Sequence, residues 1–96
     1  MLTFAQFHDR CLPVNSETAQ YGILYQSNGL GGESGELQNI VKKMVRDGMT
    51  DEKRYAALIE AGDIMFYLRQ LLQEIGFTME EAAQAELDKL EAMRNR

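Results

Sequence analysis

The sequence predicts a single all-α domain built from about four helices. Strong helix formers dominate, apolar residues recur at helical spacing, and Pro13 is the only proline. No short runs of alternating apolar and polar residues stand between turn signals, as strands would require. The 96 residues show no repeat and no linker, so residues 1–96 are expected to form one domain. With 45% apolar and 26% charged residues, the chain has the composition of a globular protein.

The first predicted helix is short and runs from about Phe4 to Leu12. Thr3 and Gln6 have the spacing of a capping box, in which each side chain bonds the other residue's backbone N–H. Pro13 ends the helix because it has no N–H and its ring clashes with the preceding turn.

The second predicted helix runs from about Glu17 to Arg46, with Ser16 as a candidate cap and Gly48 marking its end. Whether it is interrupted near residues 31–32 stays open. Glycines at 31, 32 and 35 each cost up to about 1 kcal/mol in a helix, and they indicate that another helix or a ligand comes close.

The third helix is expected to begin near Thr50 or Asp51 and to end at Gly76. The fourth is capped by Thr78, has Glu81 three residues later, and extends to about residue 93. Long helices with short connections pack as antiparallel neighbours in a bundle. Because the first helix is too short to be a full member, we expect a four-helix bundle that is completed by oligomerisation.

Charge and cysteine content exclude several classes of function. The net charge of −5 argues against binding a nucleic-acid polymer, which needs a basic face. A phosphorylated small molecule remains possible if cations bridge the negative charges. Cys11 is the only cysteine, which indicates a reducing compartment. No signal peptide opens the chain and no apolar run approaches the roughly 20 residues of a membrane span, so we expect a cytoplasmic protein without a membrane partner.

Two acidic pairs stand in otherwise uncharged stretches. No charged residue occurs in the fifteen positions before Glu33 and Glu36. Glu60 and Asp63 carry the only charges of the stretch YAALIEAGDIMFYL. Residues three apart lie on one face of a helix, so each pair shares a face. If the second and third helices pack antiparallel, the four carboxylates converge.

Four converging carboxylates repel one another unless a cation compensates them. Oxygen ligands alone suit Mg²⁺, with Mn²⁺ as a substitute, rather than zinc. The single histidine, His8, is far from both pairs, which disfavours a zinc site and a di-iron site of the Glu-x-x-His type. The alternative is that the pairs are solvated surface of an acidic helical protein; two such pairs in uncharged stretches favour the metal site.

Longer segments around these pairs resemble a known family. The segments GLGGESGELQNIVKK and EAGDIMFYLRQLLQEIGFTMEEAA, followed by KL, resemble the MazG-like all-α nucleoside triphosphate pyrophosphohydrolases. The hallmark of that family is E-x-x-E followed by E-x-x-D. Here 23 residues separate Glu36 from Glu60, and the resemblance extends from about Asn28 to Lys89.

The resemblance implies an enzyme that hydrolyses (deoxy)nucleoside triphosphates to the monophosphate and pyrophosphate, with a role in cleaning the nucleotide pool. It implies Mg²⁺ held by Glu33, Glu36, Glu60 and Asp63, and a homodimer or homotetramer with substrate sites near subunit interfaces. One carboxylate takes the proton of the attacking water. Glu36 and Glu33 are our catalytic candidates, and the sequence does not distinguish between the carboxylates.

Three basic residues are candidates for binding the phosphates. Lys43 follows Glu36 by seven residues, two turns on and on the same face. The family's N-x-x-K-L signature corresponds to ELDKLEAMR, where Lys89 matches, Glu86 replaces the asparagine and Arg94 is one place late. For Lys43 the alternative is a solvated lysine at a helix end.

Tyr67 and Asn28 are candidates for contacting the nucleotide. Tyr67 follows Asp63 by four residues and shares its face, and the alternative is a core aromatic. Asn28 precedes the GL of the first motif, and its alternative is a residue at a helix break. The altered ELDKL keeps a rival function open, a non-catalytic helical module that binds nucleotides or proteins. A second rival is a structural helical dimer in which the acidic pairs are coincidence.

Overall fold

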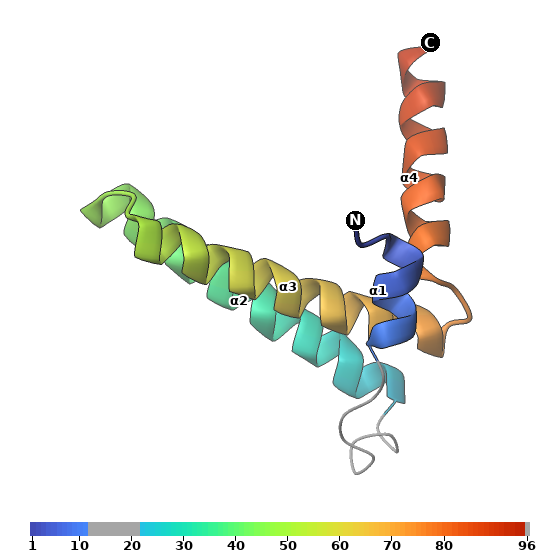
Figure 1. Ribbon diagram of the computed structural model, residues 1–96, viewed down its shortest axis with the longest axis horizontal. Helices are drawn as coiled ribbons and strands as arrows, with labels where there is room; N and C mark the ends of the chain where they lie inside the picture. Colours follow the sequence, from blue (N-terminus) through green and yellow to red (C-terminus); the bar gives the residue numbers. More distant parts are fainter. Residues whose placement is uncertain (12–21, 96) are drawn as a thin grey trace.

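The computed structural model describes residues 1–11 and 22–95. These contain four helices, α1 (Phe4–Arg10), α2 (Gly22–Asp47), α3 (Asp51–Glu74) and α4 (Met79–Arg94), and no strand (Figure 1). The all-α prediction is confirmed. The first helix is shorter than predicted, since it ends at Arg10. The predicted start of the second helix, its cap and the loop before it lie outside the described residues.

The N-termini of α1 and α4 are formed by the predicted capping boxes. The Thr3 hydroxyl accepts a hydrogen bond from the Gln6 N–H at 3.1 Å, and the Gln6 side chain accepts one from the Thr3 N–H at 2.8 Å. Thr78 and Glu81 form the same reciprocal pair, with both distances 3.1 Å. Each box satisfies backbone donors that the first turn of a helix leaves free.

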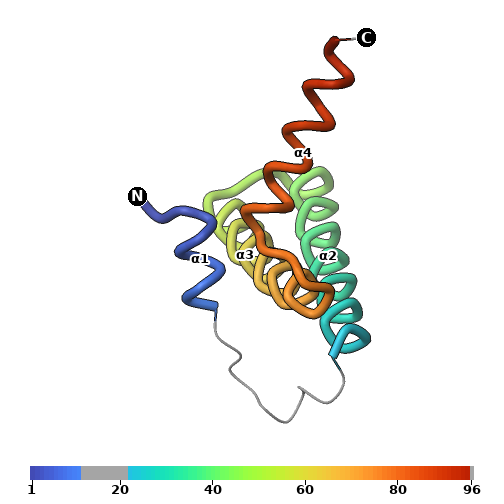
Figure 2. Tube along the Cα trace, turned by 90° about the vertical axis from the view of Figure 1, so that its right-hand side faces the viewer, coloured from blue at the N-terminus to red at the C-terminus, as the bar shows by residue number. Residues whose placement is uncertain are grey.

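The turn between α2 and α3 also follows local signals. Gly48 has a φ of +99°, a left-handed conformation that glycine adopts without strain, and it ends α2 as predicted. Thr50 caps α3 by accepting a hydrogen bond from the Lys53 N–H at 3.2 Å. The short connection makes α2 and α3 an antiparallel hairpin, which is the largest packed unit of the described chain (Figures 1 and 2).

Helix α2 is continuous through Gly31 and Gly32, so the possible interruption there is not present. A Cβ atom built at Gly31, Gly32 or Gly35 would meet nothing within 4 Å of the described chain. Within the described residues, therefore, no other helix comes close to these three glycines, and the alternative of a ligand stays a prediction. The close approach occurs instead at Gly29, against Tyr67 of α3.

Helices α1 and α4 lie at one end of the hairpin. The buried Arg69 of α3 donates from Nε to the carbonyl of His8 at 2.9 Å and so ties α1 to α3. Helix α4 turns away after Gly76, whose φ is +91°, and projects from the hairpin rather than lying along it (Figures 1 and 2). A four-helix antiparallel bundle is therefore not formed within one chain. Among the described apolar residues only Met79 is buried.

No helix in the described part of the chain is both long enough and apolar enough to span a bilayer.

Candidate functional site

Three carboxyl groups meet across the seam of the hairpin. Glu33 comes from α2, and Glu60 and Asp63 come from α3; one oxygen of each lies within 4.8 Å of the other two. The antiparallel course of the two helices places the two acidic motifs opposite each other. The ion pairs of the described residues are made elsewhere, so no Lys or Arg of that part of the chain neutralises the three carboxyls.

The close approach of the three carboxyls affects the pKa of Glu60 most clearly. Its Oε2 atom is buried and has no hydrogen-bond partner among the described residues. The pKa of Glu60 is raised from 4.5 to about 7. The main cause is the hydrogen bond that its protonated carboxyl makes with Glu33, followed by burial and by the negative charges of Glu33, Asp63 and Glu36. A proton on Glu60 thus relieves part of the repulsion.

Glu36, the fourth predicted ligand, is exposed and does not belong to this group of three. It lies on the same helix as Glu33, three residues later, and its charge contributes to the raised pKa of Glu60. The structure therefore brings three of the four predicted carboxylates together and leaves Glu36 beside them. A residue three positions on is rotated by about 60° around the helix axis, which is enough to move a side chain off the seam.

The three carboxyls fit a hard divalent cation. Mg²⁺ binds oxygens at about 2.0–2.1 Å, so two of its ligands are at most about 4.2 Å apart. The carboxyl oxygens, within 4.8 Å of one another, need only small side-chain rotations to reach that spacing. All the donors are oxygens, which suits Mg²⁺ or Mn²⁺ better than zinc. The unpartnered Oε2 of Glu60 is an acceptor that a cation would satisfy.

Tyr67 forms an aromatic wall next to the carboxyls. Its ring packs on Gly29 and lies 6.5 Å, between ring centroids, from the ring of Tyr25 and 5.4 Å from that of Phe66. The pKa of Tyr67 is raised, first by burial, then by its interaction with Tyr25 and by the charges of Glu33 and Asp63. The Tyr67 hydroxyl is therefore close enough to Glu33 and Asp63 for their charges to affect its pKa.

The predicted phosphate-binding residues are not gathered around the carboxyls. Lys43 is exposed, and its charge helps to lower the pKa of Asp47, which depends mainly on a hydrogen bond from Arg46. Lys89 forms an exposed ion pair with Glu86 at 3.1 Å. Lys89 and Arg94 belong to the half of α4 that points away from the hairpin (Figure 1).

Asn28 is exposed on α2, one residue before Gly29. No hydrogen bond from its side chain ties it to another described residue or fixes its direction.

Two relationships were missed by sequence reasoning. The contact between Gly29 and Tyr67 had a signal, because a glycine inside a long helix is unfavourable unless a neighbour needs the space. The hydrogen bond from Arg69 to the His8 carbonyl had no signal in the sequence, because every residue has a backbone carbonyl that could accept it. His8 is half-buried, and its Nδ1 atom is buried without a hydrogen-bond partner among the described residues.

Comparison with known proteins finds similarity to a phage protein. The chain is 37% identical over 78 residues to the Gene 37 protein of Mycobacterium phage L5, a match that covers 78% of this chain and 68% of the phage protein. No family model matches the chain. No solved structure matches it either.

Proposed function

For this chain, which belongs to the family of the Gene 37 protein of Mycobacterium phage L5, we propose Mg²⁺-dependent hydrolysis of (deoxy)nucleoside triphosphates. The products are the nucleoside monophosphate and pyrophosphate. The proposal rests on the resemblance of the two acidic motifs to the MazG-like pyrophosphohydrolases. The observation that supports it best is the meeting of Glu33, Glu60 and Asp63 without a neutralising Lys or Arg among the described residues.

In this proposal Glu33, Glu60 and Asp63 hold the cation, and Glu36, three residues after Glu33 on α2, is the fourth proposed ligand. When bound, Mg²⁺ neutralises phosphate charge and lowers the pKa of a coordinated water. Without a cation, the carboxylates of Glu33, Glu60 and Asp63 would repel a triphosphate, because both are anionic. The raised pKa of Glu60 is consistent with carboxylates that repel one another unless a cation or a proton binds to them.

The reaction requires a base for the attacking water. A water oxygen bonds to the α-phosphorus while the bond from that phosphorus to the bridging oxygen of the pyrophosphate breaks in line. The water proton passes to a carboxylate, and pyrophosphate leaves with the electron pair of the broken bond. Glu36 is our first candidate for this base because it is exposed beside the three other carboxyls, with Glu33 as the second.

Tyr67, near the carboxyls, and Asn28, one turn before Gly32 on α2, are proposed to contact the nucleotide. Lys43, Lys89 and Arg94 are proposed to bind phosphate oxygens. Since Lys89 and Arg94 lie on the projecting helix, they would serve a site only after assembly. We therefore include a cytoplasmic homodimer or homotetramer in the proposal, with a role in cleaning the nucleotide pool.

A second candidate function is favoured by one observation. Glu86 occupies the position of the asparagine in the family signature, and it pairs with Lys89 at 3.1 Å. A lysine held by a carboxylate is less available to phosphate. This arrangement supports a helical module that binds nucleotides or proteins without catalysis.

Pyrophosphate release tests the first proposal. The eight standard NTPs and dNTPs are incubated with the full chain in Mg²⁺ or in EDTA, and pyrophosphate is measured. We expect release in Mg²⁺ only, and a loss of at least a hundredfold in Glu33→Gln and Glu36→Gln, since positioned acid–base groups contribute on the order of 10²–10⁴. Glu91→Gln, an exposed glutamate on α4, is the matched control and should retain activity.

Absence of release from all eight nucleotides, together with Mg²⁺-dependent binding of a nucleotide, would favour the binding module instead. Release that persists in EDTA, or that is unaffected by both substitutions, would contradict the proposed mechanism.

A further inference from the structure

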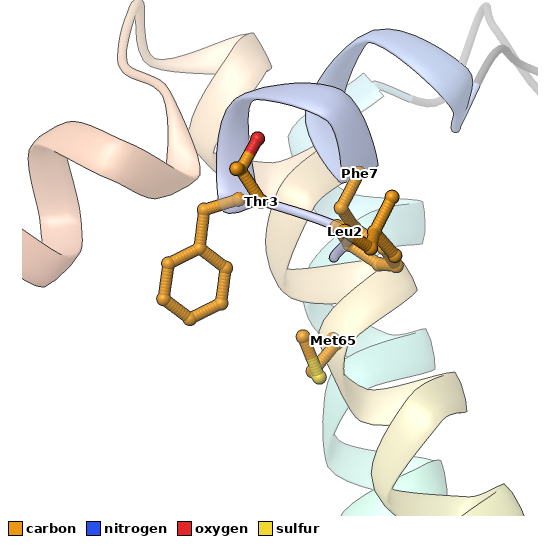
Figure 3. Close-up of a pocket in the computed structure, with 5 residues that line it drawn as sticks. Leu2, Thr3, Phe7 and Met65 are labelled. Atoms are coloured by element: carbon orange, nitrogen blue, oxygen red, sulfur yellow. The ribbon is translucent and has the colours of Figure 1, made fainter.

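Helix α1 lies on α3 without a closed apolar core between the two helices. None of the residues of α1 is buried. The helices enclose an open pocket of about 300 Å³, which is lined by Leu2, Thr3, Phe4, Phe7 and Met65 (Figure 3). The attachment of α1 therefore depends strongly on its polar contact with α3, the hydrogen bond from Arg69 to the His8 carbonyl.

Arg69 buries a positive charge that no described carboxylate neutralises. Only 5% of the residue is exposed. Its guanidinium donates from Nε to the His8 carbonyl at 2.9 Å and from Nη1 to Oε1 of Gln70 at 2.7 Å, and both acceptors are uncharged. The ion pairs of the described residues are all made by other cations. A buried charge is costly unless an opposite charge compensates it, and within the described chain Arg69 has no such partner.

The C-terminus of α1 compensates only part of this charge. The His8 carbonyl belongs to the last turn of α1, where backbone carbonyls have no partner within the helix, so Arg69 also caps that end. The dipole of a helix is equivalent to about half an elementary charge at its C-terminus. About half of the charge of Arg69 is therefore left without compensation.

Two nitrogen atoms at this contact have no hydrogen-bond partner among the described residues. A guanidinium donates from each of its nitrogens, yet no hydrogen bond joins Nη2 of Arg69 to a described residue. The Nδ1 atom of His8 is buried and is also without a described partner. Nδ1 is a donor whenever it carries the imidazole proton. A ligand with several acceptor oxygens would satisfy both residues.

This position is distinct from the carboxyl site. Arg69 follows Asp63 by six residues, which places it about 9 Å further along α3 and on another face of that helix. Asp63 meets Glu33 of α2, whereas Arg69 contacts His8 of α1. An inference about Arg69 therefore does not depend on the proposed hydrolysis.

The donors at this contact fit a small oxyanion of the phosphate class. A guanidinium binds two oxygens of a phosphate side by side, and the tetrahedral ion has a further oxygen for a donor from His8. The low exposure of Arg69, together with a half-buried His8, favours a small ion over a phosphate carried on a nucleoside. We propose that Arg69 and His8 form a binding site for inorganic phosphate, and that the bound ion fastens α1 to α3.

Calorimetric titration of inorganic phosphate into the full chain tests the site. The titration is made in EDTA at constant ionic strength, so that no divalent cation can carry phosphate to the carboxyls. We expect saturable binding that Arg69→Gln weakens at least tenfold, because a charged donor is lost. Arg54→Gln, at an exposed arginine of α3, is the matched control and should bind phosphate as the unaltered chain does. Adenosine monophosphate should bind at least tenfold more weakly than phosphate, and equal binding of the two would contradict a small-ion site.

His8→Ala decides the question if Arg69→Gln disturbs the fold. This substitution removes the imidazole and leaves the backbone carbonyl that Arg69 holds, so α1 stays attached. We expect phosphate to bind roughly threefold more weakly or worse, because one neutral hydrogen bond is lost. Hydrogen exchange at residues 4–10 should be slowed by phosphate in the unaltered chain and in Arg54→Gln, and less so in His8→Ala.

Three results would overturn the proposal. The first is the absence of saturable phosphate binding by the unaltered chain. The second is equal affinity in the unaltered, Arg69→Gln and His8→Ala chains. The third is a loss of binding in Glu33→Gln, which would place the phosphate at the carboxyl site instead.

Discussion

The ring of Tyr67 lies directly on the backbone of Gly29, so that a Cβ atom at residue 29 would be 2.3 Å from the ring's Cε1 atom. This contact joins α2 to α3 one turn before Glu33. The rings of Tyr25 and Phe66 also lie near it, with centroids 6.5 Å and 5.4 Å from that of Tyr67. The position of the aromatic wall beside the carboxyls therefore depends on the absence of a side chain at residue 29.

Gly29→Ala is expected to destabilise the fold by about 1–3 kcal/mol, the usual cost of overpacking a contact. Gly35→Ala is the matched control on the same helix, since its Cβ would meet nothing within 4 Å. It should stabilise the chain by up to about 1 kcal/mol through helix propensity. Urea unfolding of both variants measures the difference. Similar effects at the two glycines would contradict the contact.

The pKa of Glu60 predicts a dependence of stability on pH in the absence of divalent cations. Between about pH 4.5 and pH 7 the folded chain holds a proton on Glu60 that the unfolded chain has released. Because the folded state binds more protons, the free energy of unfolding falls as pH rises through this window. Urea unfolding in EDTA at pH 5 and pH 8 measures this change in the free energy of unfolding.

The Glu60→Gln variant should lose this part of the pH dependence, because glutamine stays neutral. It should therefore be more stable than the unaltered chain at pH 8 in EDTA. Glu91→Gln, on exposed surface, controls for general charge effects. An unchanged pH profile in Glu60→Gln would show that the crowding at Glu60 does not govern stability.

Mg²⁺ is expected to stabilise the folded chain at pH 8. A ligand that binds only the folded state at ten times its dissociation constant adds about 1.4 kcal/mol to the free energy of unfolding. Thermal unfolding with increasing Mg²⁺ measures the effect. Glu33→Gln and Asp63→Asn should abolish it, whereas Asp51→Asn, an exposed residue at the start of α3, should not. Equal stabilisation of all variants would place the ion elsewhere.

Arg69→Met is expected to loosen α1. The guanidinium donates to the His8 carbonyl at 2.9 Å and to the Gln70 side chain at 2.7 Å, while only 5% of the residue is exposed. Hydrogen bonds from a charged donor contribute about 1.5–3 kcal/mol each. Limited proteolysis and hydrogen exchange at residues 4–10 should report faster opening. Arg54→Met, an exposed arginine of the same helix, should change neither.

The helix caps could be predicted from the sequence, whereas the direction in which α4 leaves the hairpin could not. The capping residues Thr3, Thr50 and Thr78 act within one turn, so their effect does not depend on the rest of the chain. The course of α4 after Gly76 depends on which surfaces it contacts, and spacing along the chain carries no record of that.

The candidate site shows the same division. Opposite placement of the two acidic motifs follows from an antiparallel hairpin, which short connections favour. Which of the four carboxyls point into the seam depends on the rotation of each helix about its axis. That rotation is determined by contacts such as the ring of Tyr67 on Gly29, and it leaves Glu36 beside the other three.

The bond between Arg69 and the His8 carbonyl also bears on the order of folding, because 61 positions of chain separate its two ends. Closing so long a loop carries a larger entropic cost than closing the turn at residues 48–50, and contacts near that turn form between close neighbours in the chain. We therefore expect the hairpin to nucleate first and the N-terminal helix to attach afterwards, once Arg69 is already in place on α3.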